Sequence, residues 1–173
     1  MILDGYWKKE LKKLIKELRF WQKLSNWKLD YVEHKINRVL LLSAIIVRKI
    51  IEDEENARKE IEKLDMRMPS FKILNTTIRV LNYPFVGDKD FVAHKICVED
   101  YDLSNDKKKE VRLKDCCNWM IHAYIWNLLY DRKPGKAVGF GVASDRNKTK
   151  ELYLVRLDDW AKKLEFCIEN SNI

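Results

Sequence analysis

An apolar run of 13 residues, VLLLSAIIVRKII at positions 39–51, most constrains how this chain can fold. A helix needs about 20 apolar residues to cross a bilayer, and this run is shorter and contains Arg48 and Lys49. No membrane partner is therefore expected. We interpret the run as the middle of a central helix that is buried on nearly every side, Leu42 and Ile46 included, and it predicts a helical core.

Periodicity and turn residues place further elements around this run. Apolar residues at three- and four-residue steps, such as Leu11, Leu14 and Leu18, predict an amphipathic first helix. The fold class is therefore α+β: one domain over residues 1–173, with a helical bundle core of about four helices, short antiparallel strands and a C-terminal β-hairpin. The expected helices cover residues 4–24, 27–63, 113–130 and 158–170, and the expected strands cover residues 71–83, 90–99, 136–143 and 151–157.

Composition narrows the function classes. Five Gly and three Pro in 173 residues exclude a collagen-like, low-complexity or disordered chain. The formal net charge of +7 favours a polyanionic partner such as RNA. The four cysteines follow an N-terminal stretch without an apolar signal segment, so we expect reduced thiols and a cytoplasmic location.

The segment DCCNWMIHAYIW, residues 115–126, is the most informative for chemistry. On a helix, Asp115, Asn118 and His122 are spaced i, i+3 and i+7 and share one face, which continues into an apolar stripe. Polar groups at the start of a buried face must be hydrogen-bonded or functional. Two interpretations stay open: a structural Asn–His hydrogen-bond network, or a site in which the histidine exchanges protons with a substrate.

The spacing Asn118-x-x-x-His122 resembles the signature of the HEPN superfamily, in which an Arg is followed by a polar residue and then by a His. The resemblance implies a metal-independent endoribonuclease or RNA binder of a bacterial phage-defence or toxin–antitoxin system, with a homodimer as its assembly. Cys117 stands at the position of the motif's Arg. The chain also resembles uncharacterised bacterial proteins, and that likeness implies no activity.

Arg48 is the candidate to supply the missing cation. It lies within the apolar run, where a charged side chain needs a partner. One interpretation is a salt bridge to Asp115 or Glu52. The other is that Arg48 faces Asn118 and His122 across a helix pair and binds a phosphate through its planar fork.

A basic segment precedes the Asn118–His122 helix and is the candidate nucleic-acid-binding surface. Its charge and the nearby helix N-terminus would attract RNA. It consists of Lys107, Lys108, Lys109, Arg112 and Lys114. The same sequence is compatible with a second class of function: a non-catalytic interaction protein or a structural subunit of a larger bacterial complex, in which Arg48, Asn118 and His122 are structural.

No metal or cofactor is expected. His94 and Cys97 would point to opposite faces of a strand, and Cys116 and Cys117 diverge on a helix, so the closely spaced ligand pairs of structural zinc are missing. The chain also has no glycine-rich phosphate-binding motif.

Overall fold

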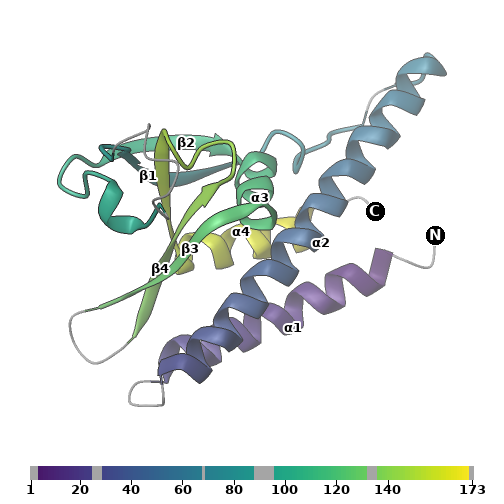
Figure 1. Cartoon of the computed structure of the whole chain (residues 1–173). Helices are drawn as coiled ribbons and strands as arrows, with labels where there is room; N and C mark the ends of the chain where they lie inside the picture. Colours follow the sequence, from purple (N-terminus) through teal and green to yellow (C-terminus); the bar gives the residue numbers. More distant parts are fainter. Residues whose placement is uncertain (1–3, 25–28, 68, 88–95, 132–135, 172–173) are drawn as a thin grey trace.

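The computed structural model of the chain describes residues 4–24, 29–67, 69–87, 96–131 and 136–171. Within these residues it is an α+β structure with four α-helices and a five-stranded antiparallel sheet (Figure 1). Comparison of the predicted helices with the structure confirms three: α1 is Asp4–Lys23, α2 is Leu29–Lys63 and α4 is Leu157–Asn170.

Helices α1 and α2 lie side by side as an antiparallel pair (Figure 1). Both bury an apolar stripe, which in α1 consists of Leu11, Leu14, Ile15 and Leu18. With 35 residues, α2 is about 52 Å long, and its last turns extend beyond the rest of the molecule (Figure 1). Ion pairs at four-residue spacing, such as Arg58 with Glu62, line this extension.

The apolar run of α2 is not buried on every side, contrary to the sequence-based expectation. Ile46 is buried, but Leu41, Leu42 and Ile45 are 40%, 37% and 46% exposed. A helix packed against partners on only part of its circumference leaves one stripe to solvent, and these three residues form that stripe.

The sheet has the strand order β2-β1-β5-β4-β3, and all neighbouring strands are antiparallel. The strands are β1 (Thr77–Pro84), β2 (Lys107–Arg112), β3 (Ala123–Tyr130), β4 (Ala137–Ser144) and β5 (Glu151–Arg156). The predicted strands at 136–143 and 151–157 therefore exist and pair with each other. They are inner strands of the larger sheet, and the helices share their core with that sheet.

Three other sequence-based predictions need correction. The predicted strand 71–83 begins only at Thr77, because residues before it form a turn in which Thr76 Oγ1 donates to the Lys72 carbonyl. For the predicted strand 90–99, residues 90–95 lie outside the described residues, and residues Val98–Asp100 form a 3-10 helix, η1. The basic segment at 107–112, which none of the expected strands covers, is the edge strand β2.

The predicted helix 113–130 is wrong in its second half. Helix α3 is Leu113–Ile121, and residues Ala123–Tyr130 form β3. The spacing of the apolar residues in this segment fits a helix as well as a strand. In the structure they alternate as in a strand: Trp126 and Leu128 contact the main core, and Ile125 contacts a cluster on the other side of the sheet. Pairing with β4, for example Ile125 with Ala143, decides for the strand.

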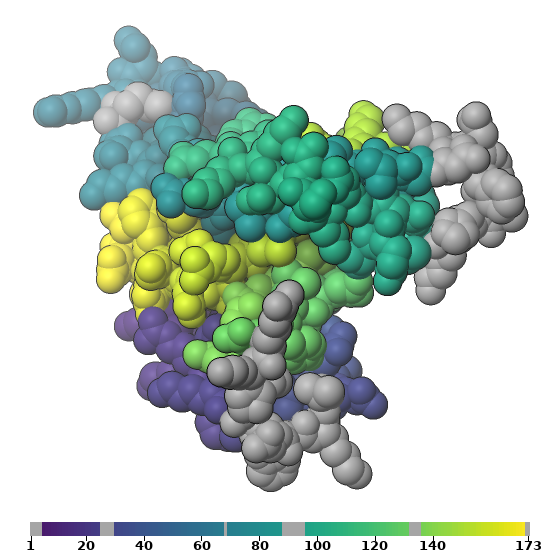
Figure 2. Space-filling model, turned by 90° about the vertical axis from the view of Figure 1, so that its left-hand side faces the viewer, coloured from purple at the N-terminus to yellow at the C-terminus, as the bar shows by residue number. Residues whose placement is uncertain are grey.

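Helices α3 and α4 pack on the face of the sheet that is turned towards the α1–α2 pair (Figure 1). The core at this junction contains Phe140 of β4 and Trp160 of α4, both fully buried. Trp160 Nε1 donates to Ser43 Oγ at 3.0 Å, which ties α4 to α2. Figure 2 shows α4 (yellow) between α1 (purple) and the strands β1 and β2 (teal), and Arg19 of α1 forms an ion pair with Glu165 of α4.

Candidate functional site

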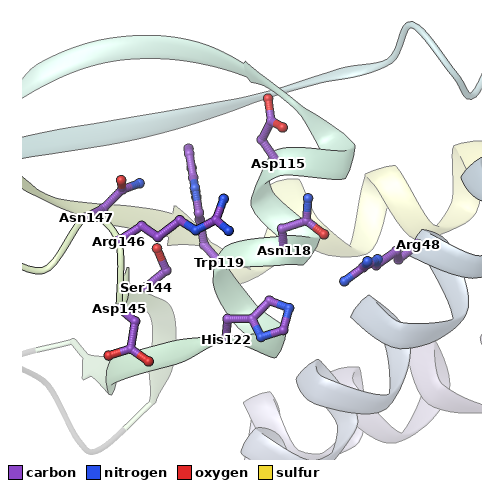
Figure 3. A pocket seen from close by; sticks show the side chains of 9 residues that line it. All are labelled: Arg48, Asp115, Asn118, Trp119, His122, Ser144, Asp145, Arg146 and Asn147. Atoms are coloured by element: carbon purple, nitrogen blue, oxygen red, sulfur yellow. The ribbon is translucent and has the colours of Figure 1, made fainter.

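A cavity of about 550 Å³ lies where α2, α3 and the turn after β4 meet (Figure 3). It brings together all four residues that the sequence nominates for catalysis: Arg48, Asp115, Asn118 and His122. The remaining lining residues are Trp119, Ser144, Asp145, Arg146 and Asn147.

Helix α3 presents two different faces, and this sets the position of the site. Its core face consists of Leu113, Cys116, Cys117 and Met120, all buried. The residues at intervening three- and four-residue steps, Asp115, Asn118 and Trp119, therefore face the cavity. Because the core face of α3 is buried, Asp115, Asn118 and Trp119 are directed towards the cavity.

His122 is the C-cap of α3 and not a residue within a longer helix. Its backbone N–H donates to the Asn118 carbonyl at 3.0 Å, and its carbonyl accepts a bond from the Asp145 N–H at 3.3 Å. These two backbone bonds hold His122 between α3 and the turn after β4. The imidazole therefore lines the cavity although the helix has ended (Figure 3).

In Figure 3, Asn118 lies above His122 and between Arg146 and Arg48. Its Oδ1 atom is buried and has no hydrogen-bond partner among the described residues. The structural interpretation required an Asn–His side-chain network. Within the described residues the bond between Asn118 and His122 is a backbone bond, so Oδ1 is a buried acceptor without a donor.

Arg48 is half-buried and forms the salt bridge with Glu52 that the sequence offered as one alternative, with Nε 2.9 Å from Oε1. This bond uses Nε, and Figure 3 shows the end of the guanidinium directed towards His122. Arg146 approaches from the opposite wall (Figure 3). The cavity therefore has a guanidinium on each side of its histidine.

Asp115 lines the cavity, but its carboxylate is already bound. Arg112 Nε donates to Asp115 Oδ2 at 2.9 Å, and a terminal nitrogen of Arg112 donates to Oδ1 at 3.2 Å. This contact raises the pKa of Arg112. Asp115 and Arg112 thus neutralise each other at the rim.

The predicted nucleic-acid-binding residues do not line the cavity. Lys107, Lys108 and Lys109 lie on the edge strand β2, where lysines also prevent pairing with the sheet of another molecule. Arg112 and Lys114 line a separate groove beside α2, and Lys114 Nζ is 2.6 Å from Glu55 Oε2.

Sequence reasoning missed Trp119 and the turn residues Ser144–Asn147. Trp119 was not singled out from the other aromatic residues of the predicted helix, and the structure places it half-buried at the cavity wall. The polar turn at 144–150 was predicted, but no local pattern indicates that it folds back against α3. Arg146 was not among the candidate residues that the sequence indicated.

Metal ligation and membrane insertion were also considered. Within the described residues, no group of three His, Cys, Asp or Glu side chains is placed to hold a metal ion, and His94 lies outside those residues. None of the described helices combines the length and apolarity that spanning a bilayer requires.

Comparison with protein-family models, with curated proteins and with solved structures finds no match to this chain. The fold and the cavity alone therefore define the class: an α+β protein with a polar pocket lined by two arginines and a histidine.

Proposed function

We propose that the cavity binds RNA and cleaves it without a metal ion. The observation that carries this proposal is the convergence of His122, Arg48 and Arg146 with the unpartnered Oδ1 of Asn118 in one cavity. Guanidinium groups match phosphate oxygens in geometry and charge, and histidine is the side chain best suited to exchange protons near neutral pH.

The reaction is an intramolecular transesterification. His122 accepts the proton of a ribose 2′-hydroxyl as O2′ forms a bond to phosphorus and the bond from phosphorus to O5′ breaks. The departing O5′ takes up a proton from water or from the imidazolium, which leaves a 2′,3′-cyclic phosphate and a 5′-hydroxyl. Arg48 and Arg146 stabilise the charge that develops on the non-bridging oxygens.

The HEPN resemblance agrees with this chemistry in one respect and departs from it in another. It assigns Asn118 and His122 to the motif, but Cys117 stands at the Arg position and is buried. Arg48 and Arg146 supply the positive charge from other elements. A role in phage defence or in a toxin–antitoxin system is proposed on the resemblance alone.

The test is cleavage of short single-stranded RNA by the purified protein in the presence of EDTA. We expect cyclic-phosphate products from the wild type. His122→Ala should lower the rate by about 10²–10⁴-fold, the usual effect of losing a general acid or base, with little change in melting temperature. His34→Ala is the matched control, because His34 is exposed on α2. Equal rates for both variants, or an inactive wild type, would refute the proposal.

A non-catalytic interaction protein is the second candidate, favoured by the exposed stripe of Leu41, Leu42 and Ile45 on α2. Aliphatic side chains gathered on one exposed helix face are typical of a protein-binding surface, for a second copy or for another subunit. Ile45→Glu would then abolish assembly, measured by light scattering, and leave RNA cleavage unchanged.

A further inference from the structure

Trp119 gives the cavity an aromatic wall that the cleavage chemistry does not use. Its ring stacks on Tyr153, with centroids 3.8 Å apart and planes inclined by 6°. Tyr153 is 3% exposed, and its hydroxyl donates to Glu151. The indole is therefore supported from behind by a fixed ring, and it is this supported indole that lines the cavity.

A fixed aromatic plane beside two cations suits an unpaired nucleotide. Bases of single strands stack on aromatic side chains while cationic groups hold the backbone. Trp119 and Asn118 both line the cavity, and Arg146 approaches from the facing turn (Figure 3). A phosphate bound by Arg48 and Arg146 would therefore lie in the same cavity as the indole.

Asn118 adds selectivity between bases. Its buried Oδ1 needs a donor, and an unpaired buried acceptor is costly. Adenine and cytosine carry an amino group at the position where guanine and uracil carry a carbonyl oxygen. The amino group of adenine or cytosine would donate to Oδ1 as the amide is oriented, whereas the carbonyl oxygen of guanine or uracil would require the amide to rotate and present Nδ2.

We propose that the cavity accommodates one unpaired adenine or cytosine of an RNA strand, stacked on Trp119, with its amino group donating to Oδ1 of Asn118. This inference rests on the proposed function only for the identity of the ligand as RNA, since binding of the base does not require cleavage.

The test is fluorescence anisotropy with labelled hexanucleotides of A, C or U that carry 2′-fluoro sugars, which have no 2′-hydroxyl to attack the phosphate. We expect the A and C strands to bind about tenfold or more tightly than the U strand. Trp119→Leu should remove most of this affinity and Trp119→Phe should retain it. Asn118→Leu should equalise the three strands. Phe20→Leu, at an exposed aromatic of α1, is the control and should change nothing.

The outcomes separate this inference from the cleavage proposal. If the A, C and U strands bind with equal affinity and Trp119→Leu does not change it, the proposed base site is wrong and the cleavage proposal is unaffected. Base-selective binding that depends on Trp119, without cleavage of natural RNA, supports the base site and overturns the cleavage proposal. No binding of any strand overturns both. Adenosine monophosphate that competes as strongly as the A strand would make the ligand a free nucleotide, and the assignment to RNA would be wrong.

Discussion

The two faces of α3 both carry side chains that can take part in chemistry, but their surroundings are opposite. The core face holds two thiols, Cys116 and Cys117, both with no exposed surface. Burial raises the pKa of Cys116 to about 12, and it raises the pKa of Cys117 as well. The cavity face holds Asn118 and ends at His122, where a buried oxygen lacks a partner.

This difference shows that residue type alone does not locate a reactive site. Thiols are strong nucleophiles only as thiolates, and apolar surroundings keep those of Cys116 and Cys117 protonated. Asn118 is chemically milder, yet the residue lines a cavity that a ligand can enter, and its buried Oδ1 lacks a partner. Accessibility and missing partners, and not intrinsic reactivity, distinguish the cavity face.

The largest contrast is expected in stability. Met120→Ala on the core face should cost about 2–5 kcal/mol in the free energy of unfolding, because Met120 is 2% exposed and truncation leaves a cavity. Asn118→Leu on the cavity face should be neutral or stabilising, because it removes an unsatisfied buried acceptor. Urea denaturation measures both. A similar loss in both variants would give Asn118 a structural role and break the comparison.

The buried thiols of the core face should react with an alkylating reagent much more slowly than a partly exposed thiol. At pH 8 a thiol with a pKa near 12 is about 10³-fold less ionised than an ordinary one, so Cys116 and Cys117 should react only after unfolding, whereas the partly exposed Cys97 reacts in the native protein. Mass spectrometry after a timed iodoacetamide pulse identifies the modified residues. Rapid native modification of Cys117 would show that the core face opens.

The same thiols make stability depend on pH in a defined direction. Because the pKa of Cys116 is higher in the folded than in the unfolded chain, its contribution to stability is complete below the ordinary thiol pKa. That contribution is lost as the pH rises through the ordinary value towards about 12. Thermal melts between pH 8 and pH 11 should show the decline, and Cys116→Ala should reduce its slope.

Charge reversal on the basic edge strand β2 tests whether RNA contacts residues outside the cavity. Reversing the charge of Lys107 and Lys108 should lower the log–log salt dependence of RNA binding by about 0.7 for each lost contact with a single strand, and leave the melting temperature nearly unchanged. The same reversal at Lys12 and Lys16 of α1, which are also exposed, controls for net charge. Identical slopes in both variants would exclude β2 from the binding path.

The smallest effect is expected at Lys114. Its ion pair with Glu55 is partly exposed, and such pairs contribute about 0–1 kcal/mol. Lys114→Met should therefore change stability and RNA affinity only slightly. A tenfold loss of affinity, measured by anisotropy, would move the binding surface from the cavity to the groove beside α2.

The sequence predicted those features that depend on local patterns. The bounds of α1 and α4 follow from apolar spacing, and the glycine- and β-branched-rich segment around Phe140 identified β4. The grouping of Asp115, Asn118 and His122 was correct, although its stated cause, a helix continuing through His122, was not.

Features that depend on contacts between distant residues could not be predicted. Residues 123–130 carry apolar side chains at spacings that suit a helix or a strand, and only β4 decides between them. Arg146 reaches the cavity because the turn after β4 lies against His122, a contact with no local signal. The exposure of Leu42 depends on how many neighbours surround α2, which hydrophobicity alone does not state.

Strand order determines when the cavity comes into existence during synthesis. Strand β5 lies between β1 and β4 in the sheet, so Leu81 can pair with Leu154 only after the five elements between these strands in the described chain have been synthesised. Pairings between distant segments form late because closing a long loop costs entropy before contacts compensate for it. Arg48 and His122 thus emerge from the ribosome well before Arg146 joins them. At about 5–20 residues per second, the last of these three side chains is added about 1–5 s after His122, so the cavity lining is complete only late in synthesis.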